Sequence, residues 1–448
     1  MKTQILRNIL PTSLSLLGLV AASPPVSAQV TFRTIYTLGG VAQPGGLNEA
    51  KPGLFYSSAG SYYFFTINTK GQVQQIAPPP SATNFIGTPL PAANDRAYAA
   101  IGNGGEGSSA IFNAVSVTPT PGSMITYAGQ NMNFALSQTL PNGTILGQAT
   151  DFSNGIVSVA TVDLSGKVTP VSQLENSNHY IYSNVIRASD GNYYGVDLTA
   201  FGGPPQEGSS YVFQVTPAGS MNRFLSLPNN ALGIYAGWII QGRDGNLYLE
   251  TPYGGANGYG AMYQVTLSGQ AKIIYSYVKG TSAHPGEFIQ ASDGNFYGAT
   301  RGVNNGVAEL YRLTLTGQYT TLHKMYGPDG LCGCSLIQAS DGILYGTTVG
   351  GGSNGAGTVF ALDAHLPKPA PQALAFRPSS GPPGTPILIW GNNLLVASVT
   401  FNGTPAAKAH SSGPNDVIAT VPAGATTGPI TVTTPGGAST TTASFTVR

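Results

Sequence analysis

Charged residues are scarce in this 448-residue chain. Asp, Glu, Lys and Arg together make up 8% of it, and the formal net charge is +1. Because no basic stripe is present, the long-range field that draws proteins to DNA, RNA or anionic lipid is missing. Lys-, Glu- or Leu-rich runs of helical periodicity are also few, so the sequence predicts little helix and no nucleic-acid partner.

Cysteine is almost absent, and its absence excludes a disulfide framework. The chain contains only Cys332 and Cys334, separated by one glycine. Two cysteines cannot complete a zinc site. A strained local disulfide and two small unpaired residues in a strand are both compatible with this spacing. The five histidines are His179, His284, His323, His365 and His410. No two of them have the spacing of paired metal ligands, so we expect no metal and no cofactor.

Glycine, proline and aromatic residues are abundant instead. The chain has 60 Gly, 33 Pro, 23 Tyr and 17 Phe against 2 Trp, and 41% of its residues are hydrophobic. So much Gly and Pro also suits disorder, but the apolar residues alternate with polar ones throughout. This pattern predicts short, packed strands joined by tight turns, which is an all-β protein.

The N-terminus has the pattern of an export signal. Lys2 and Arg7 precede an apolar segment, Leu14 to Ala22, and small residues follow at Val26-Ser27-Ala28. We expect cleavage after Ala28, which makes residues 1–28 a signal peptide and the mature protein secreted, extracellular or cell-surface. A membrane anchor is the alternative, but the apolar segment is about half of the roughly 20 residues that span a bilayer. No later segment is long enough, so no transmembrane segment is expected in the mature chain.

A repeat of about 48 residues organises the chain up to residue 364. Four copies are strong and three upstream copies are weaker. They are Ala188–Gly195, Gly242–Leu249, Ala291–Gly298, Ala339–Gly346, Leu140–Gly147, Ala93–Tyr98 and Ala50–Tyr56. Repeats of 40 to 50 residues are typical of propellers, in which each unit contributes one sheet.

The repeated Asp-Gly pairs predict hairpin turns, because Asp-Gly tolerates the positive φ angles of such turns. They contain Asp190, Asp244, Asp293 and Asp341. A ring of carboxylates for metal or acid-base work is the alternative. We favour a structural role, in which each side chain accepts hydrogen bonds from nearby backbone N–H groups.

The two ends of the array complement each other. A glycine marks a second hairpin in six units, whereas the seventh stops at Val359–Asp363, one strand short. An orphan strand, Val30–Leu38, opens the mature chain and resembles the fourth strands of other units. We therefore expect it to pair with the last unit and close a seven-bladed β-propeller, with six or eight blades as alternatives.

The units with Asp-Gly-Asn-Phe-Tyr-Gly, a Gly/Asn-rich loop and an aromatic strand such as Gly357–Phe360 resemble the GloVer-type tandem repeat of bacterial exported proteins. The resemblance covers about residues 30–364 and is strongest in the last four units. It implies an exported repeat protein and carries no catalytic residues to this chain.

A Pro-rich segment separates the array from a C-terminal domain. We expect a β-propeller at 29–364, a linker at 365–372 and an immunoglobulin-like β-sandwich at 373–448. The C-terminal strands and turns resemble those of an IPT/TIG domain. They are Pro378–Pro386, Ile387–Asn393, Val399–Thr404, Ala419–Pro422 and Gly428–Gly437. Alternation predicts the inward pairs Ile387/Ile389, Val399/Phe401, Ile418/Thr420, Ile430/Val432 and Phe445/Val447.

No nucleophile or phosphate-binding motif stands out, so no catalytic or ligand-binding residue is assigned. A tyrosine recurs in each second strand and is expected to pack between blades. Loops after the second strands, such as Phe201–Ser209 and Tyr253–Gly260, are the expected ligand region. The sequence favours a monomeric, non-catalytic protein that binds an extracellular glycan or surface protein, with the IPT/TIG-like domain as spacer or docking module. An extracellular polysaccharide lyase or glycoside hydrolase is the alternative.

Overall fold

The structure is a computed structural model in which residues 29–448 are described except at several gaps. The gaps are 40–43, 60–62, 77–83, 93–95, 103–108, 116–123, 127–131, 141–143, 152, 154, 164, 174–178, 182, 200–209, 227–237, 253, 279–284, 301–306, 332–334 and 396. All regular secondary structure in the described residues is β-strand, as expected from the composition. No described segment forms a helix that is long and apolar enough to cross a membrane.

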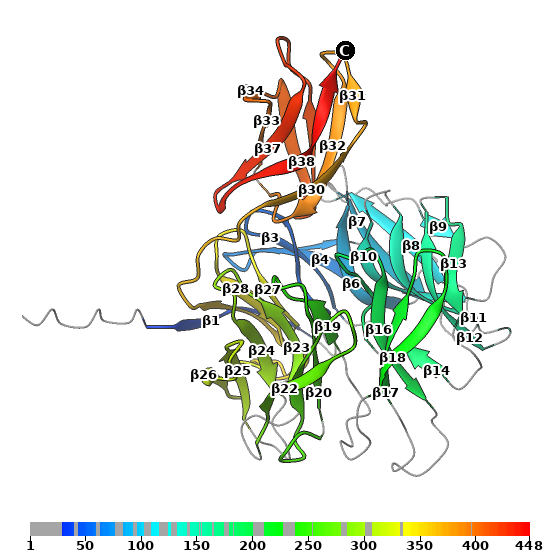
Figure 1. Cartoon of the computed structure of the whole chain (residues 1–448). Coiled ribbons are helices and arrows are strands. Elements are labelled where there is room, and N and C mark those ends of the chain that lie inside the picture. The colour runs from blue at the N-terminus through cyan, green and yellow to red at the C-terminus, as the bar shows by residue number, and fades with distance from the viewer. Residues whose placement is uncertain are drawn as a thin grey trace, which may run out of the picture.

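Within the described residues, the repeat array forms seven antiparallel sheets, one for each predicted unit (Figure 1). The first sheet contains β2 (Asn48–Lys51), β3 (Leu54–Ala59), β4 (Tyr63–Asn68) and β5 (Val73–Ile76), and the second contains β6 (Asn84–Ala92), β7 (Arg96–Gly102), β8 (Ser109–Val115) and β9 (Met124–Thr126). The third sheet contains β10 (Met132–Thr139), β11 (Ile145–Asp151), β12 (Ile156–Val162) and β13 (Val168–Gln173). The fourth contains β14 (His179–Ile181), β15 (Ile186–Arg187), β16 (Tyr193–Thr199), β17 (Ser210–Val215) and β18 (Met221–Ser226). The fifth sheet contains β19 (Trp238–Gln241), β20 (Leu247–Thr251), β21 (Ala261–Val265) and β22 (Ala271–Ser276). The sixth contains β23 (Pro285–Gln290), β24 (Phe296–Thr300), β25 (Ala308–Leu313) and β26 (Tyr319–Met325). The seventh contains β27 (Ser335–Gln338), β28 (Leu344–Thr347), β29 (Thr358–Asp363) and β1 (Thr31–Thr37).

The N-terminal strand β1 is the fourth strand of the last sheet. It pairs antiparallel with β29, from Thr31 opposite Asp363 to Thr37 opposite Thr358. This pairing confirms the one predicted from the missing strand. Leu38 N–H donates to the Gly357 carbonyl at 3.0 Å, as Tyr277 N–H donates to the Gly260 carbonyl at 2.9 Å in the sheet that ends with β22.

Hydrophobic side chains fill the space between neighbouring sheets. Tyr248 and Met262 of one sheet share a core with Phe296 and Tyr311 of the next. Similar cores join the other strong units along the chain. The last and first sheets are joined in the same way, since a single buried cluster contains Tyr345, Val359, Phe55 and Phe65. The sheets therefore form a propeller-like array.

The C-terminal domain is a sandwich of two sheets. One has the strand order β30 (Gln372–Arg377), β32 (Pro386–Asn392), β36 (Asp416–Thr420), β35 (Lys408–Gly413). The other has the order β31 (Ser380–Gly381), β38 (Gly437–Val447), β37 (Gly428–Thr434), β33 (Ser398–Phe401), β34 (Thr404–Pro405).

The core of this sandwich corrects one predicted inward pair. Val417 and Ala419 are fully buried, whereas Ile418 lies on the outer side of the sheet, and so does Thr420. The reason is register: Val417 lies opposite Ile389 and Ala419 opposite Ile387, both of which point inward. A shift of one residue exchanges the two faces of a strand.

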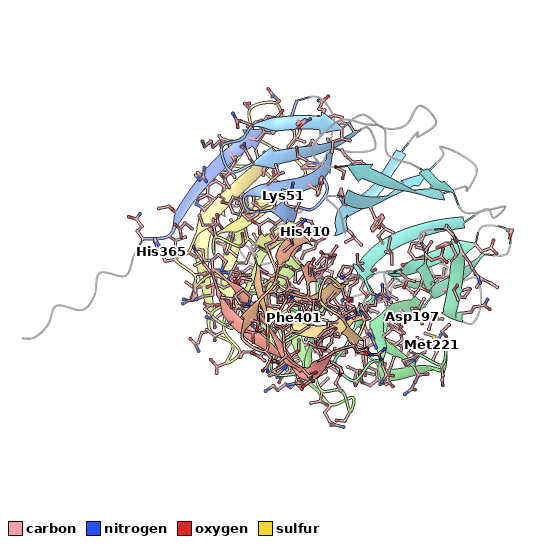
Figure 2. All side chains as sticks on the ribbon, turned by 90° about the horizontal axis from the view of Figure 1, so that it is seen from above. Lys51, Asp197, Met221, His365, Phe401 and His410 are labelled. Atoms are coloured by element: carbon pink, nitrogen blue, oxygen red, sulfur yellow. The ribbon has the colours of Figure 1, made fainter. Side chains whose placement is uncertain are left out.

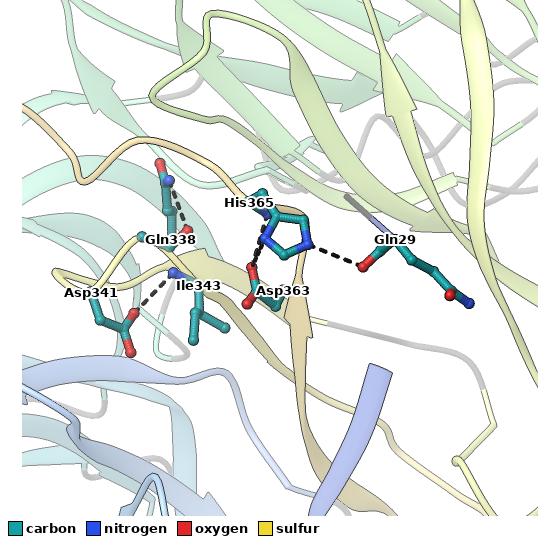
Figure 3. A network of polar contacts seen from close by, with 7 residues as sticks. Gln29, Gln338, Asp341, Ile343, Asp363 and His365 are labelled. Atoms are coloured by element: carbon teal, nitrogen blue, oxygen red, sulfur yellow. Dashed lines mark hydrogen bonds and ion pairs between the residues drawn. The ribbon is translucent and has the colours of Figure 1, made fainter. Parts of the chain in front are cut away.

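The C-terminal domain stands on the face of the array that carries the turns between first and second strands (Figure 1). From above, Phe401 and His410 of this domain lie over the middle of the array (Figure 2). The linker contacts the turns, since the Pro367 carbonyl accepts hydrogen bonds from Ser292 Oγ at 2.5 Å and Gln338 Nε2 at 3.0 Å. Figure 3 shows that His365 also links the two ends of the array. Its backbone N–H donates to Asp363 Oδ1 at 2.9 Å, and its ring Nε2 lies 3.1 Å from the Gln29 carbonyl oxygen.

Candidate functional site

The face beneath the C-terminal domain is built from one repeated hairpin turn. In the unit of Asp190, Gly191 N–H donates to the Ala188 carbonyl and Ala188 N–H donates to the Asn192 carbonyl, both at 2.9 Å. Gly191 has φ of 86°, and none of the four repeated aspartates has a positive φ. The turn is therefore a type I turn followed by a left-handed glycine, and only the glycine needs the positive φ.

Each repeated aspartate uses its carboxylate within its own turn. Asp293 Oδ1 accepts from Asn295 N–H at 3.0 Å, and its Oδ2 accepts from Asn295 Nδ2 at 2.7 Å and from the Tyr297 hydroxyl at 2.8 Å. The Tyr194, Tyr248 and Tyr345 hydroxyls donate to Asp190, Asp244 and Asp341 in the same way. These four carboxylates thus hold their own turns and anchor a buried tyrosine in each second strand.

These bonds also set the acidity of the groups. Partial burial alone would raise the pKa of Asp244, but hydrogen bonds from Tyr248, Asn246 and Gln264 bring that pKa below its usual value. Burial, followed by the hydrogen bond to Asp244, raises the pKa of Tyr248. The pair therefore stays as carboxylate and phenol across the physiological range.

A glutamine at the end of the first strand joins each of the last three units to the one before it. Gln241 Oε1 accepts from Ser189 N–H of the preceding unit, and Gln241 Nε2 donates to its own Gly245 carbonyl, both at 2.8 Å. Gln290 and Gln338 make the equivalent bonds.

Glu49 takes the place of this glutamine in the first unit. It accepts from Ser340 N–H of the last unit at 2.7 Å and from Gly53 N–H at 2.9 Å. Burial raises the pKa of Glu49, although these hydrogen bonds oppose the increase. The junction of the last and first units therefore repeats the contact found between consecutive units.

Arginine replaces the repeat residue at two positions in adjacent units. Arg187 stands where the later strong units have Gln290 and Gln338, and Arg243 stands where they have Ser292 and Ser340. Arg187 Nε donates to its own turn, at the Gly191 carbonyl, at 3.5 Å. Arg243 Nη1 donates to the Ser292 carbonyl of the next unit at 2.9 Å.

Both arginines line a cleft of about 740 Å³ between the turns and the C-terminal domain. The array contributes Arg187, Gln241 and Arg243 to its wall. Gln372, Leu374 and Asn392 of the C-terminal domain contribute to the opposite wall. Leu374 is 62% exposed although it is a large apolar residue. Open volume, polar groups and one exposed apolar side chain together suit a bound ligand.

A smaller cavity of about 150 Å³ lies nearby between the same two parts. Its walls include Glu49 and Ser340 of the array and Asn393 and Leu395 of the C-terminal domain. The carboxylate of Glu49 is already occupied by the hydrogen bonds that join the first and last units. We therefore regard the larger cleft as the candidate site.

A buried glutamate lies away from the cleft, between the sheets of β20 and β25. Glu250 Oε1 accepts from the Tyr277 hydroxyl and, at 2.5 Å, from the Tyr311 hydroxyl. Glu250 Oε2 has no hydrogen-bond partner among the described residues. Burial raises the pKa of Glu250 to about 8, against the lowering effect of the two tyrosines. This carboxyl lines neither cavity and belongs to the packing of the array.

Of the regions that the sequence favoured for ligands, the described loop at 254–260 does not line this cleft. The loop at 254–260 is held against its own sheet, because Asn257 Nδ2 donates to the Tyr277 carbonyl at 3.1 Å. Phe201–Ser209 and the pair Cys332 and Cys334 lie outside the described residues. No cluster of three or more His, Cys, Asp or Glu in the described part of the chain is arranged to hold a metal ion.

Comparison with known families finds a match in the repeat array and another in the C-terminal domain. Residues 234–406 match the Gloeobacter/Verrucomicrobia repeat, and residues 371–447 match the IPT/TIG domain. The chain carries a Gloeobacter/Verrucomicrobia repeat and an IPT/TIG domain. Both resemblances inferred from the sequence are thereby confirmed; the repeat match covers the last three units and continues to residue 406, where it overlaps the IPT/TIG match.

Similarity to solved structures is distant. Prolyl oligopeptidase B from Galerina marginata is 12% identical over 88% of this chain and 56% of its own, with a TM-score of 0.49. An oligogalacturonate lyase in complex with manganese is 12% identical over 75% of this chain and 96% of its own, with a TM-score of 0.47. A fungal alcohol oxidase of the AA5 family in complex with copper is 13% identical over 93% and 99%, with a TM-score of 0.43. No curated protein matches this chain. The activities of these distant proteins have no bearing on this one.

Sequence reasoning did not predict the residues that line the cleft between the Gloeobacter/Verrucomicrobia repeats and the IPT/TIG domain. Its turn residues were interpreted only as structural, and Gln372 and Leu374 belong to a domain whose position no sequence pattern gives. One signal was nevertheless available. Arg187 and Arg243 depart from the repeat, and a residue that departs from a structural repeat without improving its packing is a candidate for binding.

Proposed function

We propose that this protein binds a saccharide, without catalysis, in the cleft between the repeat array and the IPT/TIG domain. The cleft of about 740 Å³ carries the proposal. Amide groups of Gln372 and Asn392 supply donors and acceptors for sugar hydroxyls beyond the one hydrogen bond between them. The exposed Leu374 supplies an apolar surface for the C–H face of a sugar ring.

The proposed scaffold is a seven-bladed β-propeller closed by the N-terminal strand. Support comes from the pairing of β1 with β29 and from the Ser340–Glu49 contact between the last and first units. Closure removes the two open sheet edges that a linear array would expose. A rigid closed scaffold keeps the turns around the cleft in fixed positions.

The IPT/TIG domain acts in this proposal as a wall of the site rather than a spacer alone. Its β30 and β32 supply cleft residues, and the linker is hydrogen-bonded to the turns through Pro367. We further propose export by the signal peptide at residues 1–28. The mature monomer then comprises the propeller (29–364), linker (365–372) and IPT/TIG domain (373–448), and acts outside the cell or at its surface.

A saccharide-binding screen on residues 29–448 tests the proposed function. We expect retention of a saccharide by the wild-type protein and weaker retention by Leu374→Ser, which removes the apolar contact. Leu331→Ser is the matched control, because Leu331 is also exposed, at 51%, but does not line the cleft. Equal effects of the two substitutions would contradict the location of the site.

The same screen separates binding from catalysis. The alternative function, an extracellular polysaccharide lyase or glycoside hydrolase, predicts shortened or unsaturated products from the retained saccharide. Binding with intact saccharide supports the proposal, and reproducible turnover that Leu374→Ser reduces would replace it with the enzymatic one.

A further inference from the structure

We propose that the cleft selects acidic saccharides, whose carboxylate or sulfate groups bind Arg187 and Arg243; this inference rests on the proposed saccharide site and specifies its ligand. Arg187 and Arg243 line the cleft from adjacent units, and no Asp or Glu is among the described residues that line it. In a chain with a net charge of only +1, this is a local excess of positive charge. Such an excess attracts an anionic ligand.

The two guanidinium groups are available to a ligand. Both side chains are exposed, and neither forms an ion pair with a described residue. The hydrogen bonds to Gly191 and Ser292 use one N–H of each group. A guanidinium has five N–H donors in a planar arrangement that matches carboxylate and sulfate oxygens.

The repeat shows that the turns form without arginine at these two positions. At the position of Arg187, a glutamine in the later units accepts a hydrogen bond from a backbone N–H of the preceding turn, whereas the turn that precedes Arg187 has Pro141 there, which has no N–H to donate. At the position of Arg243, the turns that contain Asp190, Asp293 and Asp341 have a serine. Arg187 keeps one donor bond to its own turn and Arg243 makes one to the next unit, and both also bring a positive charge to the same cleft.

The neighbouring groups favour a saccharide over an acidic peptide. Gln372 on β30 and Asn392 on β32 lie opposite each other and line the cleft from the IPT/TIG domain, and Leu374 lines it from the same strand as Gln372. An acidic sugar offers a charged group, adjacent hydroxyls and an apolar ring face within one residue. This combination matches guanidinium, amide and leucine together.

The decisive variant restores the repeat. Arg187→Gln with Arg243→Ser gives both turns the residues found in the later units, so the fold is expected to be retained. The control is Lys167→Gln with Lys272→Gln, which removes two exposed positive charges outside the cleft. Circular dichroism and the melting midpoint verify folding of both variants of residues 29–448.

Binding is measured by calorimetry with tetragalacturonate, its fully methyl-esterified form, a sulfated galactan tetrasaccharide, neutral galactotetraose and hexaglutamate. We expect an acidic tetrasaccharide to bind the wild type and the lysine control, and the arginine variant to bind it about 100-fold more weakly. This corresponds to about tenfold for each lost charge-assisted contact. Raising the salt from about 0.05 to 0.5 M should weaken wild-type binding severalfold and leave the residual binding of the arginine variant unchanged.

The outcomes separate the two proposals. If the neutral or esterified tetrasaccharide binds as tightly as the acidic ones, and the arginine variant binds normally, the inference about charge is wrong while the saccharide site stands. If none of the saccharides binds, the proposed function itself is contradicted. Binding of hexaglutamate as tight as that of the acidic sugars would overturn the saccharide assignment in favour of an acidic peptide.

Discussion

The rings of Phe55 and Tyr345 lie with their centroids 4.5 Å apart, although they belong to the first and last units of the array. The rings of Phe296 and Tyr248, at the same positions of two consecutive units, lie 4.6 Å apart. The junction between the chain ends is therefore packed like a junction inside the array.

The N-terminal strand should be required for cooperative folding. A chain that begins at residue 39 loses β1 and exposes the edge of β29, together with the surface that Leu38, 1% exposed, now covers. We expect a loss of several kcal/mol of unfolding free energy relative to a chain that begins at residue 29, because apolar burial and a full strand pairing are both removed. Equal melting midpoints of the two chains would contradict a role for β1 in closing the array.

Glu49 should stabilise the junction through its acceptor atoms rather than its charge. In Glu49→Ala the N–H groups of Ser340 and Gly53 lose their acceptor, which should cost about 2 kcal/mol of unfolding free energy. Glu49→Gln keeps one acceptor oxygen for Ser340 N–H, as in Gln241, Gln290 and Gln338, and loses the acceptor for Gly53 N–H, so it should cost about half as much, about 1 kcal/mol. Chemical denaturation measures both, and equal losses in the two variants would contradict this explanation.

Asp293 should stabilise its turn together with Tyr297. Asp293→Ala removes the acceptor for Asn295 and for the buried Tyr297 hydroxyl, so we expect a loss of about 1–3 kcal/mol. A double-mutant cycle with Tyr297→Phe should show a favourable coupling of about 1 kcal/mol between the two residues. Unchanged stability of Asp293→Ala, accompanied by loss of saccharide binding, would instead assign the aspartate to the ligand site.

Glu250 should make the protein less stable as the pH rises. Burial holds its pKa at about 8 in the folded protein, above the usual value of 4.5. The folded state therefore binds this proton more tightly than the unfolded state, so the associated stability is present below about pH 4.5 and is lost as the pH rises to about 8. At about 1.4 kcal/mol per pKa unit the effect amounts to several kcal/mol.

Glu250→Gln tests this dependence, because glutamine has a similar shape and does not ionise. Near pH 5 the variant should differ from wild type by no more than about 1 kcal/mol. At pH 9 it should be the more stable of the two, since it has no buried charge next to Tyr277 and Tyr311. A constant difference in unfolding free energy between pH 5 and 9 would show that Glu250 does not titrate in this range.

Local patterns determined the repeat and the strands. Asp-Gly turns at regular spacing, alternating apolar residues and the missing last strand sufficed to predict repeated antiparallel sheets, which are four-stranded except for the extra short strand β15, and the pairing of Val30–Leu38 with Thr358–Asp363. These predictions succeeded because turn geometry and strand alternation depend on residues that are close in sequence. The same reasoning failed at Ile418, where the partner strand β32, rather than local alternation, sets which side faces inward.

Tertiary structure alone decided where a ligand could bind. Sequence reasoning favoured the loops after the second strands, whereas the described cleft lies on the opposite face, between the turns of Arg187 and Arg243 and the IPT/TIG strand that carries Leu374. These walls are separated by more than a hundred residues and a linker, and no periodic pattern records how two domains dock. Docking depends on the complementary shape of finished surfaces, which exist only after each domain has folded.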